Sequence, residues 1–141
     1  MESSSERQER IRRLGRPTVY QRRDLAQHFF LSAYLTVVVG PQAAEAAGVA
    51  KELVDARSGS GFSYVDLAAN MAGIVFAERL LRGELTVEQV AGQFQIQQFM
   101  PDVADLPEGL RWEEVSKQLV GQGNNSLAGR RRLIIQRIKQ L

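Results

Sequence analysis

The chain has 141 residues, of which 44% are apolar and 24% charged, and its formal net charge is +2. A chain of this length can bury a core of its own as one domain, and so small a net charge does not by itself indicate nucleic-acid binding. Cysteine is absent, which excludes disulfides, thiolate chemistry and zinc sites with cysteine ligands.

The hydropathy of the sequence indicates neither a signal peptide nor a membrane-spanning segment. Residues 1–23 are polar and lack the apolar run of a signal peptide. The longest apolar run, residues 29–39, has 11 residues and is interrupted by Ser32 and Thr36, whereas a helix that spans a bilayer needs about 20. We therefore expect no transmembrane span. The absence of a signal peptide and of cysteine favours a cytoplasmic location.

Residues 1–23 form an Arg-rich arm in front of the predicted domain. We expect this arm to be disordered or weakly helical, because Gly15 and Pro17 interrupt any helix in it. Arginine side chains bind phosphate, so an anionic membrane surface or a nucleic acid is a candidate partner of the arm. Its arginines are Arg7, Arg10, Arg12, Arg13, Arg16, Arg22 and Arg23.

The predicted domain covers residues 24–141. Its first part, residues 24–82, is expected to contain three helices, at 24–39, 41–57 and 63–81. Asp24 begins the first of them, Pro41 suits the first turn of the second, and Ser63 caps the third. The last two are rich in small residues, which let neighbouring helices approach closely. These are Ala43, Ala44, Ala46, Ala47, Gly48, Ala50, Ala69, Ala72, Gly73 and Ala77.

The second part of the domain, residues 86–141, is expected to add helices at about 87–99, 111–120 and 126–141. Thr86 and Gln89 form a capping-box pattern, and Ser126 caps a last amphipathic helix with many basic residues. No useful β-alternation appears. We therefore predict an all-α bundle of about five to six helices, with the three-helix core packed through small residues.

Three lines of polar residues run along the helices of residues 24–82. Within each line the spacing is three, four or seven residues, which places its members on one helical face. Polar groups that face one another among packed helices cost stability unless they are paired, so we expect one polar cluster centred on His28, the only histidine. The lines are Asp24, His28 and Ser32; Glu45, Glu52 and Asp55; and Asp66 and Asn70.

His28, Glu52 and Asp55 are the candidate catalytic residues. An imidazole can act as acid, base or metal ligand near neutral pH. The two carboxylates, one turn apart, could orient it, chelate a cation or act as an acid–base pair. The structural alternative is a core histidine bonded to a carboxylate, with Lys51 pairing Asp55 on a solvated helix face.

For the other polar residues of the three lines, structural roles offer simpler explanations than catalysis. Asp66 follows Ser63 by three residues, where a carboxylate caps backbone N–H groups, and Asn70 could bond Asp66, the backbone or His28. Asp24 can be a plain N-cap. Ser32 would be a nucleophile only beside a base, and His28, four residues earlier on the same helix, is poorly placed for that role.

We predict no cofactor, but a divalent metal remains an open alternative. One histidine with several carboxylates is a reasonable donor set for zinc, iron or manganese. The paired Glu-x-x-His motifs of di-iron bundles are missing.

The order of these motifs resembles a set of small helical bacterial proteins, the YfiM-type putative lipoproteins and, more distantly, the VanZ-like family. The resemblance covers about residues 24–80 and implies a three-helix unit with polar positions, but no established reaction. The chain has no lipobox cysteine and lacks the long apolar spans of VanZ-like membrane proteins. The motifs are His28-Phe29 with Ser32, then Gly48 with Lys51-Glu52-x-x-Asp55, then Phe62-Ser63-x-x-Asp66-Leu67-x-x-Asn70-x-x-Gly73.

Three functions remain from these observations. The leading one is a non-enzymatic scaffold or interaction module, which self-associates or binds a larger protein and whose polar cluster fixes helix register. The second is a hydrolase-like enzyme that uses His28 with Glu52 and Asp55, with or without a metal. The third is an accessory protein held at a membrane surface or nucleic acid by the Arg-rich arm.

Overall fold

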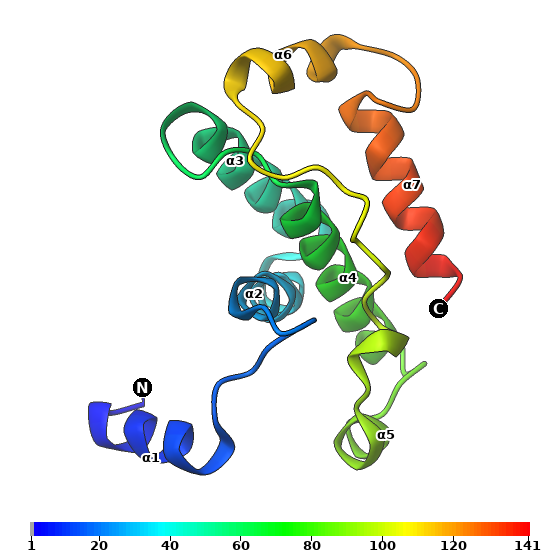
Figure 1. Cartoon of the computed structure of the whole chain (residues 1–141). Helices are drawn as coiled ribbons and strands as arrows, with labels where there is room; N and C mark the ends of the chain where they lie inside the picture. The colour runs from blue at the N-terminus through cyan, green and yellow to red at the C-terminus, as the bar shows by residue number, and fades with distance from the viewer. Residues whose placement is uncertain (1) are drawn as a thin grey trace.

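The computed structural model describes residues 2–141, which form seven α-helices, one 3₁₀-helix and no β-strand (Figure 1). The all-α prediction is confirmed, with seven helices in place of the expected five to six. The helices are α1 (Ser4–Leu14), α2 (Arg23–Val39), α3 (Pro41–Ser58), α4 (Tyr64–Leu81), α5 (Val87–Gln93), η1 (Ile96–Gln98), α6 (Trp112–Val120) and α7 (Leu127–Lys139).

The additional helix, α1, lies in the Arg-rich arm and projects away from the bundle (Figure 1). Its first turn is held by a capping box between Ser3 and Glu6, which offsets the weak helical tendency of the arm. Gly15, with a φ of 70°, ends α1. None of its residues is buried. Met1, the first residue of the arm, lies outside the described residues.

The three-helix core is formed by α2, α3 and α4, and two of their contacts depend on glycine. A Cβ at Gly73 of α4 would lie 2.0 Å from the backbone oxygen of Phe29 on α2. A Cβ at Gly48 of α3 would lie 2.7 Å from Nδ2 of Asn70 on α4. The small residues at these positions therefore set how closely, and in which rotation, the three helices meet.

The start of α2 differs from the prediction. The helix begins at Arg23 with Arg22 as the N-cap residue, and no side chain caps it. Asp24 instead pairs with Arg22, whose Nη2 lies 2.6 Å from Asp24 Oδ2. An ion pair with a neighbouring guanidinium thus replaces the predicted N-cap role of Asp24. No helix among residues 2–141 combines the length and apolarity needed to cross a membrane.

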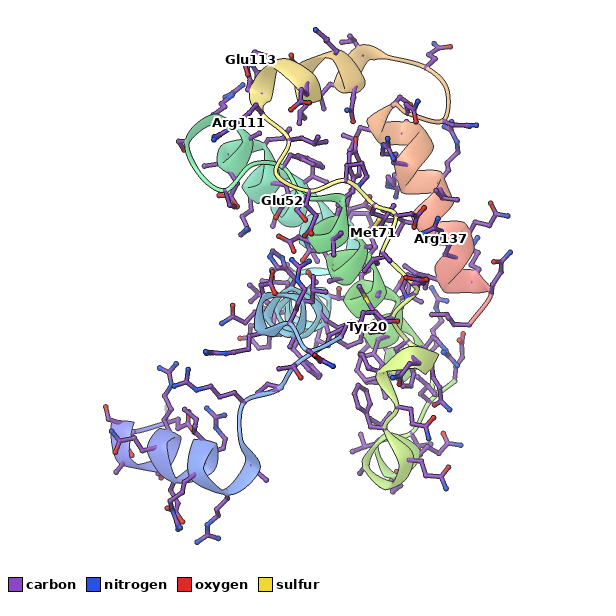
Figure 2. All side chains as sticks on the ribbon, viewed as in Figure 1. Tyr20, Glu52, Met71, Arg111, Glu113 and Arg137 are labelled. Atoms are coloured by element: carbon purple, nitrogen blue, oxygen red, sulfur yellow. The ribbon has the colours of Figure 1, made fainter. Side chains whose placement is uncertain are left out.

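The C-terminal half wraps over α3 and α4 (Figure 1). Val115 of α6 and Ile134 of α7 are fully buried, and the guanidinium of Arg57 on α3 lies 3.9 Å from the ring centroid of Trp112. Tyr20, before α2, reaches the segment after η1 and donates a 2.9 Å hydrogen bond to the Met100 carbonyl (Figure 2).

The helix expected at residues 87–99 is shorter than predicted. α5 begins after the predicted Thr86–Gln89 capping box but ends at Gln93, and only the single turn η1 follows. Phe94 leaves the helix and stacks on Phe99, with ring centroids 5.4 Å apart and an interplanar angle of 11°. Phe94 also packs near Phe30 of α2 and Phe76 of α4, with ring centroids 6.3 Å and 6.2 Å away. Aromatic packing against distant helices therefore overrides the local helical pattern.

Candidate functional site

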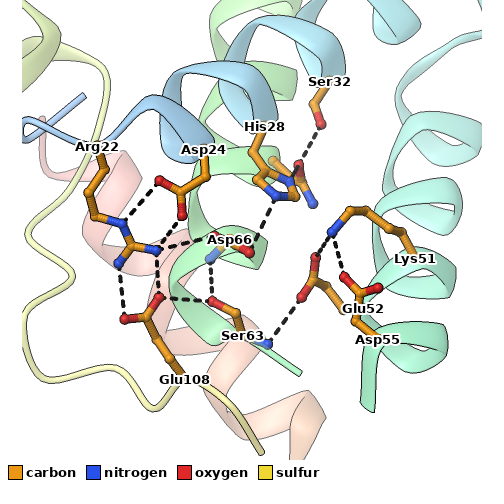
Figure 3. Close-up of polar contacts among 11 residues, drawn as sticks. Arg22, Asp24, His28, Ser32, Lys51, Glu52, Asp55, Ser63, Asp66 and Glu108 are labelled. Carbon is orange, nitrogen blue, oxygen red and sulfur yellow. Dashed lines mark hydrogen bonds and ion pairs between the residues drawn. The ribbon is translucent and has the colours of Figure 1, made fainter. Parts of the chain in front are cut away.

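A buried polar cluster lies where α2, α3 and α4 meet (Figure 3). We define the His28 cluster as His28 and Ser32 from α2, Glu52 from α3, and Asp66 and Asn70 from α4. Their side chains come together because α2 and α3 approach α4 closely at Gly73 and Gly48. The cluster contains the sequence-predicted pairs His28–Ser32 and Asp66–Asn70, each four residues apart on one helix.

The two ring nitrogens of His28 have different partners on α4. Nδ1 lies 3.0 Å from Oδ1 of Asn70, and the Ser32 hydroxyl donates a 2.9 Å bond to the same oxygen. An amide oxygen can only accept, so His28 donates through Nδ1–H. Nε2 faces Oδ2 of Asp66 at 3.3 Å. The ring is thereby oriented, and Nε2 is the nitrogen left for an ionic partner.

The surroundings of His28 favour its protonated form. Burial is the largest single influence and lowers the pKa, but the hydrogen bond and charge of Asp66, together with the Asn70 bond, outweigh it. The pKa of His28 therefore lies above its usual value of 6.5. In the folded protein the protonated ring and the Asp66 carboxylate form an ion pair between α2 and α4.

Glu52 is the only fully buried acidic side chain among residues 2–141 (Figure 2). Its Oε2 accepts a 3.1 Å bond from the backbone N–H of Ser63, and its Oε1 lies 3.2 Å from the ammonium of Lys51. Burial, followed by the negative charge of Asp66, raises the pKa of Glu52, and the bonds from Lys51 and Ser63 oppose that shift. Glu52 and Asp66 are thus two carboxylates that repel each other across the cluster.

Asp66 is positioned by the start of α4. Ser63 is the N-cap, as predicted, and its hydroxyl accepts a 3.0 Å bond from the Asp66 backbone N–H. This bond fixes the first turn, so the Asp66 carboxylate points toward α2 and meets His28 (Figure 3). Oδ1 of Asp66 is buried and has no hydrogen-bond partner among the described residues. The nearest cationic atom paired with it is Nη2 of Arg22, at 3.8 Å.

Three residues of the predicted polar lines lie outside the His28 cluster, each paired with a basic residue. Asp24 pairs with Arg22, and Glu45 forms an ion pair with Arg131 of α7. Asp55, a candidate catalytic residue, is 2.7 Å from Lys51. The partners of the His28 ring are therefore Asp66 and Asn70, and no contact joins Asp55 to it.

The sequence analysis did not single out Arg22 and Glu108. Arg22 bonds Asp24 and Glu108, and Ser63 donates a 3.3 Å bond to Glu108, so this ion-pair group adjoins the His28 cluster (Figure 3). Glu108 is 45 residues from Ser63 and 86 residues from Arg22 in the sequence. No local pattern encodes such distances.

A cavity of about 460 Å³ lies beside the cluster, between α2 and α3. Its polar lining comes from His28, Ser32, Lys51 and Asn70, and its apolar lining includes Leu31 and Leu35. Nδ2 of Asn70 is buried without a hydrogen-bond partner in the described part of the chain. The cavity gives small solutes a route to the side of the cluster that holds His28 and Lys51.

The His28 cluster contains a set of atoms suited to a metal ion. One ligand atom each from His28, Glu52 and Asp66 lies within 4.8 Å of the other two. The Ser32 hydroxyl donates its hydrogen bond to Asn70 and not to the His28 ring. The geometry therefore offers a nitrogen and two carboxylates around one point rather than a serine nucleophile beside a base.

Comparisons with family models, with curated proteins and with solved structures found no match to this chain. The resemblance to YfiM-type and VanZ-like proteins therefore stays a prediction, and function is argued from the geometry alone.

Proposed function

We propose that this chain is a helical interaction module that associates with a second copy of itself through the exposed face of α2. The observation that carries the proposal is a row of exposed apolar side chains on that helix, from 43% to 63% exposed. Single exposed apolar residues are ordinary, but a contiguous set is typical of an association surface. We define the α2 apolar face as Phe30, Leu31, Tyr34, Val37 and Val38.

The opposite face of α2 is anchored in the core. Leu25 and Phe29 are fully buried, and Ser32 and Thr36 are nearly so. The bonds of His28 and Ser32 to Asn70 hold α2 in one rotation relative to α4. A helix fixed in this way presents its apolar face without the entropy cost of ordering it on binding.

A second copy fits this face because the face carries no charge. Residues 29–40 contain no Asp, Glu, Lys or Arg, so a partner selected by charge would find nothing to pair with. Two identical uncharged faces match each other about a twofold axis, the commonest symmetry of homo-oligomers. That axis also sets the two helices antiparallel when it crosses them at right angles, which aligns their dipoles favourably.

Sedimentation of the full chain tests this proposal. We expect a monomer–dimer equilibrium over an about hundredfold range of concentration, which Val38→Lys shifts to monomer because it places a charge in a desolvated contact. Val54→Lys is the matched control, because Val54 is 60% exposed but lies on α3 outside the α2 apolar face. This control should leave the equilibrium unchanged.

Two results would contradict the proposal. A wild-type chain that stays monomeric over the whole concentration range would show that the α2 apolar face does not bind a second copy. Binding of a monomer to vesicles of anionic lipid, lost in Val38→Lys and retained in Val54→Lys, would assign the face to a membrane surface instead.

A further inference from the structure

We propose that His28, Glu52 and Asp66 bind a divalent transition-metal ion, with Zn²⁺ as the best fit, where α2, α3 and α4 meet. This site does not rest on the proposed self-association: none of its three ligands belongs to the α2 apolar face, although Leu31 of that face lines the cavity beside His28. The three ligand atoms lie within 4.8 Å of one another. Nε2 of His28 and Oδ2 of Asp66 are 3.3 Å apart, close to the roughly 3.4 Å expected between two ligands bound tetrahedrally at about 2.0–2.2 Å.

The hydrogen bonds of His28 prepare it for this role. Nδ1–H donates to Asn70 Oδ1, which the Ser32 hydroxyl holds from the other side. A metal-binding histidine usually donates its other ring N–H to an oxygen, which fixes the tautomer and aims the free nitrogen at the ion. In the neutral ring of this chain that free nitrogen is Nε2, and it points at the two carboxylates (Figure 3).

Charge and burial also favour a cation at this place. Glu52 is fully buried, and Oδ1 of Asp66 is buried without a hydrogen-bond partner among residues 2–141. Two ionised carboxylates at this distance repel each other, and a divalent ion between them would remove the repulsion. The cation paired with Oδ1 is Arg22, whose Nη2 lies 3.8 Å away, so this buried oxygen lacks the hydrogen bond that buried polar atoms usually have.

In the structure the ammonium of Lys51 pairs with Glu52, and a metal ion could displace it. Its ammonium is 3.2 Å from Glu52 Oε1 and 2.7 Å from Asp55 Oδ2. The Lys51 side chain is 51% exposed, so it can turn to Asp55 alone and leave Glu52 to the metal. Of the three proposed ligands, His28 lines the neighbouring cavity, together with Lys51. A nitrogen ligand with few carboxylates selects transition metals over Mg²⁺ and Ca²⁺.

The first test uses the metal-free full chain and zinc chloride, and it needs no variant. His28 is the only histidine, so its ring signals in the NMR spectrum are identified at once. We expect these signals to shift with added Zn²⁺ and to stop shifting at about one equivalent, with Nε2 as the coordinated nitrogen; added Mg²⁺ should leave them in place. Signals that do not move, or that drift without saturation in excess zinc, would overturn the proposal.

Calorimetry on variants then identifies the ligands. Glu52→Gln and Asp66→Asn should weaken Zn²⁺ binding by at least about tenfold. Glu45→Gln, the same substitution on the same helix outside the His28 cluster, should leave the affinity unchanged. Lys51→Gln should tighten binding, because it removes the competing cation. Equal weakening by Glu45→Gln and Glu52→Gln, or weaker binding in Lys51→Gln, would show nonspecific binding to surface carboxylates and refute the site.

Discussion

At the scale of single residues, the His28 cluster depends on the two ring nitrogens of His28 meeting two side chains one turn apart on α4. The two nitrogens of His28 face Asp66 and Asn70, which are four residues apart on α4 and therefore adjacent on its surface. A shift of α2 along α4 by one residue would break both contacts. His28 thus links the rotation and the register of α2 to the start of α4.

The stability of the metal-free protein should fall as pH rises through the pKa of His28. That pKa lies above 6.5 in the folded chain, so the native state binds the ring proton more tightly than the unfolded chain does. This contribution to the free energy of unfolding is fully present below about pH 6.5 and is lost above the folded pKa. Urea unfolding at about pH 6 and about pH 9, with an NMR titration of the ring, measures it.

The control for this experiment is His28→Gln, which keeps the raised pKa of Glu52. The Glu52 shift, caused by burial and by Asp66, also lowers stability as pH rises, but from about 4.5 upward. We expect the slope between the two pH values to be smaller in the variant. A ring that titrates at or below 6.5, or equal slopes in the two proteins, would show that Asp66 does not hold the proton on His28.

The sequence could supply the members of the cluster but not their pairing. The spacings His28–Ser32 and Asp66–Asn70 place each pair on one face, and this much follows from helical periodicity. Which carboxylate of the Glu45–Glu52–Asp55 line faces inward depends on the rotation of α3. That rotation is set by the contact of Gly48 with Asn70. Of the two outer members, Glu45 pairs with Arg131, 86 residues away, and Asp55 pairs with Lys51.

At the scale of elements, local signals predicted the helices that have strong caps. Pro41 begins α3, Ser63 caps α4 and Ser126 caps α7, as predicted. The predicted length of α5 was wrong because Phe94 packs near Phe30 and Phe76, which lie on other helices outside any local window. The starts of α3, α4 and α7 were therefore predictable from the neighbouring residues, whereas the end of α5, which tertiary packing decides, was not.

The closest helix contact gives a sharp prediction about α4. Gly73→Ala would place a Cβ 2.0 Å from the backbone oxygen of Phe29, and α2 and α4 would have to separate. We expect a loss of more than about 2 kcal/mol in the free energy of unfolding. Gly92→Ala is the control, because Gly92 lies in helix α5 with open space around it, and it should be neutral or stabilise by up to about 1 kcal/mol. Equal effects in the two variants would refute the close approach.

At the scale of the whole molecule, the C-terminal half clamps the three-helix core while α1, the first part of the Arg-rich arm, stays outside. Arg131 of α7 pairs with Glu45 of α3, and Arg137 pairs with Asp105 in the loop after η1 at 2.7 Å. Ile134 is fully buried beneath them. In contrast, the ion pairs of α1 join residues of the arm to one another, such as Arg12 to Glu9. The arginines of α1 are therefore available to a partner outside the bundle.

Removal of residues 1–16 should leave the melting temperature unchanged within about 2 °C, because no residue of α1 is buried. Ile134→Ala is the matched destabilised variant, and it should lose about 2–5 kcal/mol by leaving a cavity under α7. Calorimetry compares both with the full chain. If the arm binds an anionic membrane or a nucleic acid, the shortened chain should also lose salt-dependent binding to anionic vesicles or duplex DNA. Unchanged binding would show that the arm does not bind the membrane or the nucleic acid. A melting temperature as low as that of Ile134→Ala would show that residues 1–16 belong to the cooperative fold.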